Sequence, residues 1–239
     1  METWKILVLF FCAFLGGLCI FLVKSDKSQL LKLILSFSGA YLFAITVLHL
    51  IPDAYSGPDH DQIGIYILIG FLLQIFLEQF SDGVEHGHVH HQHDNELQIF
   101  PYGIMISLCL HAFLEGMPLA VDHHNALIFG IALHHIPAAF ALASILMQNK
   151  FSTNKIVFYL FVFAIMAPLG FLLSVGISSG AVGGIALYFN KIMGIVIGIF
   201  LHISTTILFE SGVEHKVSRR KMVAVLLGVS IALIGFYVS

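Results

Sequence analysis

The feature that most constrains this chain is a series of eight apolar stretches, each long enough to cross a lipid bilayer. A spanning helix needs about 20 predominantly apolar residues. Because hydrocarbon cannot hydrogen-bond the backbone, stretches of this length are expected to be helical there. The stretches lie near residues 4–23, 31–52, 63–81, 100–121, 125–148, 155–177, 184–211 and 221–238. The sequence therefore predicts an all-α integral membrane protein with eight transmembrane helices in a single transmembrane domain, residues 1–239.

Composition supports a multi-pass membrane protein and argues against other classes. Only 10% of the residues are charged, whereas a soluble domain carries about 25%. The net charge of −3 offers no basic surface for nucleic acid. The three cysteines lie in apolar runs without a CxxC pair, which indicates packed core residues rather than disulfides or ligands. We expect the bilayer as a partner, and neither a nucleic acid nor an organic cofactor.

The distribution of Lys and Arg predicts the orientation, because connections on the cytoplasmic side carry most of these residues. With the N-terminus outside, only Lys5 and Lys191 of the eleven fall on the outer side. The connection 52–62 carries three aspartates and neither Lys nor Arg. We therefore expect both termini outside and the plasma (inner) membrane as the location.

One connection, residues 82–98, is long, polar and rich in histidine. The orientation above places it in the cytoplasm. Its alternating histidines do not match a closed zinc fold and indicate a loop that binds metal loosely, with an inert polar linker as the alternative. The histidines are His86, His88, His90, His91 and His93.

The stretch "HAFLEGMP" places His111 and Glu115 four residues apart inside the fourth span, hence on one helix face. His111 lies about 16 Å along its helix, and His134 of the antiparallel fifth span lies about 14 Å along its own. Both depths are near the middle of a core about 30 Å thick. Imidazole and carboxylate groups together suit zinc and other first-row divalent metals. The sequence therefore predicts a divalent-metal site at the membrane midplane.

Two prolines follow these polar residues. Pro118 and Pro137 lack a backbone N–H, so the carbonyls of Leu114 and Leu133 are expected to lose their helical partners. Such carbonyls are tolerated at depth where they line a cavity.

Other ionisable residues in the spans lie off-centre. His49 and His202 are each either packed core residues or steps on an ion path. Asp53, after Pro52, either collects cations at the outer mouth or ends a helix. Glu78 and Glu210 lie near inner helix ends, where solvation is the simplest explanation. A related sequence around His49 ("VLHLIPDAYSG") and His202 ("FLHISTTILFESG") predicts an inverted repeat of helices 1–3 and 6–8 around helices 4 and 5.

These motifs resemble those of the ZIP family of divalent-metal transporters, the zinc/iron-regulated transporter-like proteins. "HAFLEG" is similar to the family's His-(Asn/Ser)-x-x-(Asp/Glu)-Gly, and "HHIPAA" resembles its fifth-helix motif. Eight helices, outer termini, the histidine-rich loop and "HLIPDA" extend the resemblance over most of the chain. It implies that His111, Glu115 and His134 are transport-site ligands, and that His135 occupies a variable position.

Three positions depart from the family pattern. Ala112, Ala138 and Ala167 stand where many members carry donors to a second, adjacent metal. We therefore expect a single metal in the membrane interior. His135 is the expected fourth ligand, with a water or the Leu133 carbonyl as alternatives.

The resulting hypothesis is a transporter, not an enzyme, that moves a divalent cation from outside into the cytoplasm. Zinc is the expected substrate, with iron, manganese or cadmium as alternatives. The metal would enter past Asp53 and His49 and leave past Glu214, His215 and the loop. Three alternatives remain at this point: an intramembrane zinc-dependent hydrolase, a haem-binding electron carrier, and a metal-sensing membrane protein without transport. A homodimer is also left open.

Overall fold

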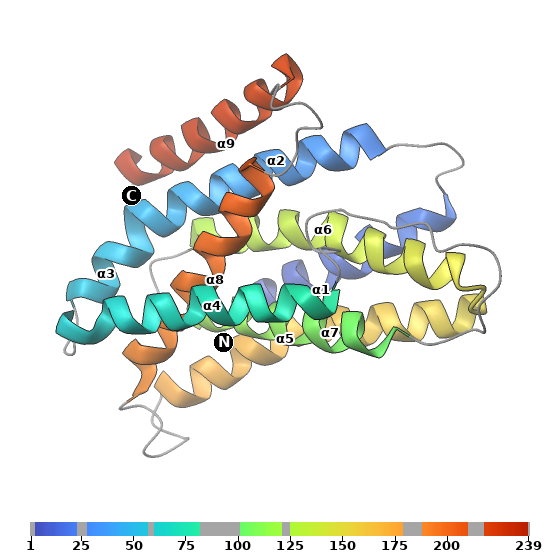
Figure 1. Cartoon of the computed structure of the whole chain (residues 1–239), viewed down its shortest axis with the longest axis horizontal. Coiled ribbons are helices and arrows are strands. Elements are labelled where there is room, and N and C mark those ends of the chain that lie inside the picture. Colours follow the sequence, from blue (N-terminus) through green and yellow to red (C-terminus); the bar gives the residue numbers. More distant parts are fainter. Residues whose placement is uncertain are drawn as a thin grey trace.

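The computed structural model of the chain (Figure 1) is built from long helices that pack side by side. It describes residues 3–22, 28–56, 60–81, 101–120, 125–178, 188–209 and 218–238. Within these ranges every regular element is helical.

Eight helical segments are long and apolar enough to cross a membrane among the described residues, which confirms the eight predicted spans. The α-helices are α1 (Thr3–Leu18), α2 (Ser28–Ile45), α3 (Ile51–Ser56), α4 (Ile63–Ser81), α5 (Tyr102–Gly116), α6 (Asn125–Gln148), α7 (Thr153–Ser178), α8 (Phe189–Phe209) and α9 (Arg219–Val238). Shorter turns extend them: the 3-10 helices η1 (Cys19–Phe21), η3 (His60–Gln62) and η5 (Met117–Ala120), and the π-helix η2 (Thr46–Leu50).

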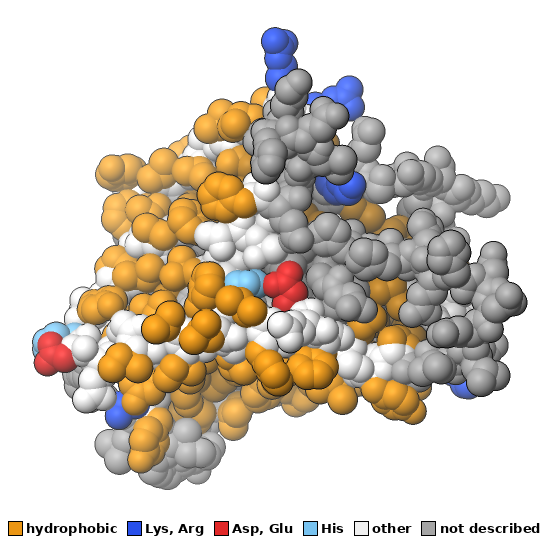
Figure 2. Space-filling view, viewed as in Figure 1, with side chains coloured by type: hydrophobic (Ala, Val, Ile, Leu, Met, Phe, Trp, Pro, Cys, Tyr) orange, Lys and Arg blue, Asp and Glu red, His pale blue; other side chains and the backbone are white. Residues whose placement is uncertain are grey.

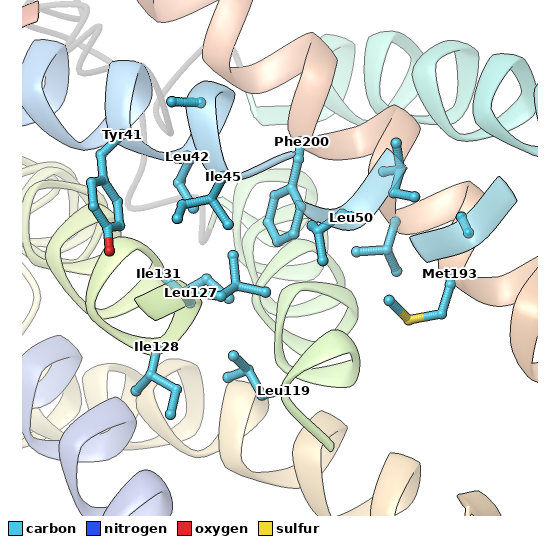
Figure 3. Close-up of a cluster of buried hydrophobic side chains, with 14 of the residues drawn as sticks. Tyr41, Leu42, Ile45, Leu50, Leu119, Leu127, Ile128, Ile131, Met193 and Phe200 are labelled. Carbon is cyan, nitrogen blue, oxygen red and sulfur yellow. The ribbon is translucent and has the colours of Figure 1, made fainter. Parts of the chain in front are cut away.

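The helices pack as pairs that are distant in sequence. Helix α1 packs against α6 and α7, α2 against α9, α6 and α8, α4 against α8 and α5, and α5 against α7. Helix α6 also packs against α7, so α5 and α6 each receive neighbours from both halves of the chain. Figure 3 shows the largest apolar cluster, where Leu42 and Ile45 of α2, Leu127 and Ile131 of α6 and Phe200 of α8 meet.

The second span is longer than the sequence predicts. It continues past residue 52 through the π-helix η2 and α3 to Ser56. Pro52 cannot donate the hydrogen bond that an α-helix requires, and a wider π turn directly before it accommodates the missing donor. His49 lies within this π turn.

The side chain of Lys5, near the beginning of α1, is buried. Its Nζ donates to the carbonyl of Leu119 over 3.3 Å and lies 5.7 Å from the ring centre of Phe171. A cation at the carbonyl end of a helix is favourable, so Lys5 fastens α1 to the end of η5.

Helices α4 and α8 approach until their backbones touch. A Cβ added at Gly70 would collide with the carbonyl of Ile195, and one added at Gly198 would collide with the carbonyl of Ile67 and lie 2.6 Å from the nitrogen of Phe71. Small residues allow such contact. In lipid there is no hydrophobic driving force between helices, so van der Waals packing of this kind holds them together. The alignment of α4 and α8 therefore depends on these glycines.

We predict that Gly198→Ala lowers the apparent melting temperature of the detergent-purified protein by about 2–10 °C, because overpacking costs about 1–3 kcal/mol. Gly235→Ala is the matched control, since an added Cβ there meets no atom within 4 Å. Circular dichroism during heating measures both. Equal melting temperatures for the two variants would contradict the close packing of α4 and α8.

Candidate metal site

The site begins with two residues on one face of α5. His111 and Glu115 are both fully buried, and His111 Nε2 lies 3.4 Å from Glu115 Oε1. Glu115 Oε1 accepts no hydrogen bond from the described residues. A carboxylate oxygen in the membrane interior therefore faces an imidazole nitrogen without a hydrogen bond between them.

Helix α6 adds a third potential ligand to this pair. His111, Glu115 and His134 each offer one donor atom, and these three atoms all lie within 4.8 Å of one another. All three residues are buried. The ring centres of His111 and His134 are 5.8 Å apart. The structure thus brings together the three residues that spacing and depth had placed at one level, as a group that could hold a metal ion.

His135 is placed differently from its neighbour. Its Nε2 lies 2.6 Å from Glu115 Oε2, and its ring lies edge-on to Phe163 at 5.7 Å. It is outside the group of three whose donor atoms all lie within 4.8 Å. A carboxylate oxygen only accepts hydrogen bonds, so the geometry is that of an imidazole N–H donating to Glu115.

Gln74 is a site residue that sequence analysis missed. It lies on α4 with no exposed surface, and its Oε1 is 3.4 Å from His111 Nδ1. An oxygen beside Nδ1 favours the tautomer with the proton there, which places the lone pair on Nε2, where it could bind a metal. The available signal was an amide in the middle of an otherwise apolar span.

The three alanines lie in apolar surroundings beside the site. Ala112, Ala138 and Ala167 are each 1% exposed. Ala112 and Ala138 share an apolar cluster, and a Cβ added at Gly116 would collide with the carbonyl of Ala167. The backbones of α5 and α7 are therefore in contact at Gly116 and Ala167.

A second polar contact lies further along α4. His202 Nε2 of α8 is 3.4 Å from Glu78 Oε2, and the His202 ring lies edge-on to Phe71 at 5.0 Å. The Glu78 side chain is 23% exposed, so the expectation that it is simply solvated was wrong. Figure 2 shows a histidine and an acidic side chain next to each other in a break of the apolar surface.

Of the other sequence-predicted residues, His49 and Asp53 are described and are not part of this group of three. The ring of His49 packs edge-on against Phe236 of α9 at 5.1 Å, and Asp53 is exposed on α3. The loop histidines His86, His88, His90, His91 and His93, together with Glu210, Glu214 and His215, lie outside the described residues.

The expected free carbonyl at Leu114 was wrong. Helix α5 ends at Gly116 and tightens into η5, so that the N–H of Met117 donates to the Leu114 carbonyl. A 3-10 bond of this kind satisfies the group that Pro118 leaves without its α-helical donor.

Comparison with known proteins places this chain in a family. The model of the ZIP zinc transporter family matches residues 81–238, which include α5 to α9. The chain belongs to the ZIP zinc transporter family.

Individual ZIP relatives agree with this assignment. "Zinc transporter ZIP9" of Xenopus tropicalis is 27% identical over 206 residues, covering 73% of this chain and 65% of the relative. "Zinc transporter ZIP9-B" of Xenopus laevis is 26% identical over 230 residues, covering 78% of this chain and 73% of the relative. "Zinc transporter ZIP9" of Micropogonias undulatus is 28% identical, covering 61% of this chain and 50% of the relative. The chain thus spans about half to three quarters of the length of these relatives.

The hydrogen bond from His135 to Glu115 is expected to stabilise the metal-free protein. We predict that His135→Phe lowers the apparent melting temperature by about 2–10 °C, because an unsatisfied buried oxygen costs about 1–3 kcal/mol. His135→Gln retains an N–H donor and should recover part of the loss. Heating in detergent with a chelator measures both, and a His135→Phe variant as stable as the parent would rule out this role.

Proposed function

We propose that this ZIP protein carries a divalent cation across the membrane, with zinc as the preferred substrate, and that His111, Glu115 and His134 are its ligands at the midplane. The observation that carries the proposal is the buried group of these three residues on α5 and α6. Intramembrane ionisable residues are rare, and they usually mark an ion pathway.

The spacing of the donor atoms is compatible with zinc. Zinc holds nitrogen and oxygen ligands at about 2.0–2.2 Å in a tetrahedron, so that neighbouring ligand atoms lie about 3.3–3.6 Å apart. The 3.4 Å between His111 Nε2 and Glu115 Oε1 matches this edge. Three protein ligands leave one position for water or another donor, which suits a cargo that must also be released.

Polar residues on one face of α4 supply a route away from the site. Gln74 contacts His111, and Glu78, four residues further along, contacts His202. Residues four apart share a helix face, so polar groups continue from the ligands toward the end of α4. The positive-inside rule makes that end cytoplasmic, and we propose that metal leaves in this direction toward the histidine-rich loop, in the plasma (inner) membrane. Entry past Asp53 and His49 completes the proposed path.

An inverted repeat would provide alternating access to the two sides. In such a repeat, α1 corresponds to α7, α2 to α8, α4 to α9 and α5 to α6. The contact between α1 and α6 then corresponds to the contact between α7 and α5, and the contact between α2 and α9 to that between α8 and α4. Both members of each pair are packed together. The same correspondence relates the His49–Phe236 ring contact to the His202–Phe71 contact. These equivalences support the repeat of helices 1–3 and 6–8.

The rival functions explain less of this arrangement. A zinc hydrolase would also use three ligands and a water, but the polar line through Gln74 and Glu78 has no part in that reaction. The relatives above are named zinc transporters, which favours transport over a haem carrier or a sensor.

Single substitutions of the three ligands test the proposal. We predict that His111→Ala, Glu115→Gln and His134→Ala each abolish zinc uptake. Loss of a residue that only hydrogen-bonds a metal ligand weakens metal binding by about 10–100-fold, and each of these three variants should weaken zinc binding by more than that. Calorimetry in detergent on a variant lacking residues 86–93 measures binding, and proteoliposomes measure uptake. His60→Ala is the control, because His60 is exposed beside Asp61. Normal uptake by any of the three ligand variants would refute its role.

Metal stoichiometry tests the single-site expectation. Without residues 86–93, the protein should bind one zinc tightly, because Ala112, Ala138 and Ala167 offer no donor atoms. Ala138→Glu adds a carboxylate one turn from His134 and should raise the stoichiometry or change the metal preference. Two strong anomalous-scattering peaks between α5, α6 and α7 in the parent protein would overturn this reading.

A further inference from the structure

A basic groove lies between the beginnings of α2 and α9, away from the metal ligands. It has a volume of about 500 Å³ and is lined by Lys32, Leu33, Ser36, Ser218, Arg219, Arg220 and Lys221. Figure 2 shows Lys and Arg side chains at the top of the molecule, where α9 begins in Figure 1. No acidic side chain is among the described residues that line it.

Two of the lining residues, Lys221 and Ser218, form hydrogen bonds within the protein. Lys221 is buried, and its Nζ donates to the carbonyls of Ile207 over 3.3 Å and Leu208 over 2.9 Å, which fastens α9 to the end of α8. Ser218 Oγ accepts the backbone N–H of Lys221 over 3.3 Å, as an N-cap does. The charge of Lys221 is therefore engaged within the protein.

The other three cations face outward. Lys32, Arg219 and Arg220 are exposed, and none of them forms an ion pair with an acidic side chain in the part of the chain that the structure describes. Three like charges around one groove repel one another. An anion between them would remove this repulsion, and the planar guanidinium groups of two arginines suit the oxygens of a phosphate.

The position of the groove indicates where that phosphate comes from. The candidate spans begin at Leu30 in α2 and at Arg219 in α9, so the cations lie at the edge of the hydrocarbon core. Directly below them α9 exposes apolar side chains to the bilayer, with Val223 55% and Leu226 58% exposed. A charged groove above an apolar helix face fits a molecule with a phosphate head and acyl chains.

We propose that Lys32, Arg219 and Arg220 bind the headgroup phosphate of an anionic phospholipid, which links the beginnings of α2 and α9. Helix α9 buries few residues of its own, namely Lys221, Gly228 and Ala232. A lipid in the groove therefore adds a contact to the least enclosed helix of the bundle. Each basic side chain near an anionic headgroup strengthens binding by about fivefold.

The test measures the apparent melting temperature of the full chain in a neutral detergent with three additives at equal concentration: phosphatidylglycerol, phosphatidylcholine with the same acyl chains, and soluble glycerol 3-phosphate. Phosphatidylglycerol should raise the melting temperature by at least about 2 °C more than phosphatidylcholine, and glycerol 3-phosphate should have no such effect. Equal shifts with both lipids would overturn the proposal. An equal shift with glycerol 3-phosphate would assign the groove to a soluble phosphate compound instead.

Variants assign the effect to the groove. Arg219→Gln with Arg220→Gln should weaken phosphatidylglycerol retention in native mass spectrometry by about 25-fold. Lys150→Gln with Lys155→Gln, which removes the same charge elsewhere, should leave retention unchanged. Loss of retention in both double variants would indicate a general charge effect and refute the site. Should the arginine double variant not fold, Lys32→Gln alone should weaken retention by about fivefold, and unchanged retention there would equally refute it.

Discussion

The carboxylate of Glu115 is the constraint on which the rest of the site depends. A charged side chain in the membrane interior is costly: inserting one at the centre of a membrane helix costs at least about 2.5–3.5 kcal/mol. It therefore persists only with partners. The structure supplies His135 on one oxygen and His111 near the other. Gln74 in turn lies beside the far nitrogen of His111. His135 and His111 thus accompany the carboxylate, and Gln74 orients the imidazole whose other nitrogen is the proposed ligand.

These polar contacts require helix positions that apolar side chains alone would not fix. Contact between backbones fixes them on two sides of the site: α4 meets α8 at Gly70 and Gly198, and α5 meets α7 at Gly116 and Gly170. Because the backbones can approach this closely only where a glycine lies, α4 cannot slide far along α8. Helix α4 is therefore held where Gln74 and Glu78 reach their histidines. The packing glycines and the polar residues are therefore parts of one arrangement.

The sequence predicts the spans and the proximity of His111, Glu115 and His134 well, and it predicts the partners of other residues poorly. Apolar length alone identifies a membrane helix, and the spacing of His111 and Glu115 with the depth of His134 depends only on helix geometry. The contacts of Gln74, Glu78 and Lys5 depend instead on which helix faces meet. A helix that is apolar on every side carries no stripe to reveal that face. Solvation was therefore the wrong expectation for Glu78, and the burial of Lys5 could not be predicted. The π turn around His49 likewise follows from Pro52 only once the helix is known to continue beyond it.

The charge of the site limits how many metals it can hold. With neutral imidazoles, Glu115 gives the site one negative charge, and a bound divalent cation changes this to one positive charge. A second divalent cation about 4 Å from the first would be repelled by about 16 kcal/mol at an effective dielectric constant of 20, and a carboxylate at that distance returns only about 8 kcal/mol. Glu115 alone therefore leaves a second cation unfavourable by about 8 kcal/mol, and one further carboxylate is the least that would balance it. Ala112, Ala138 and Ala167 provide none, which supports the proposal of a single metal in the membrane interior.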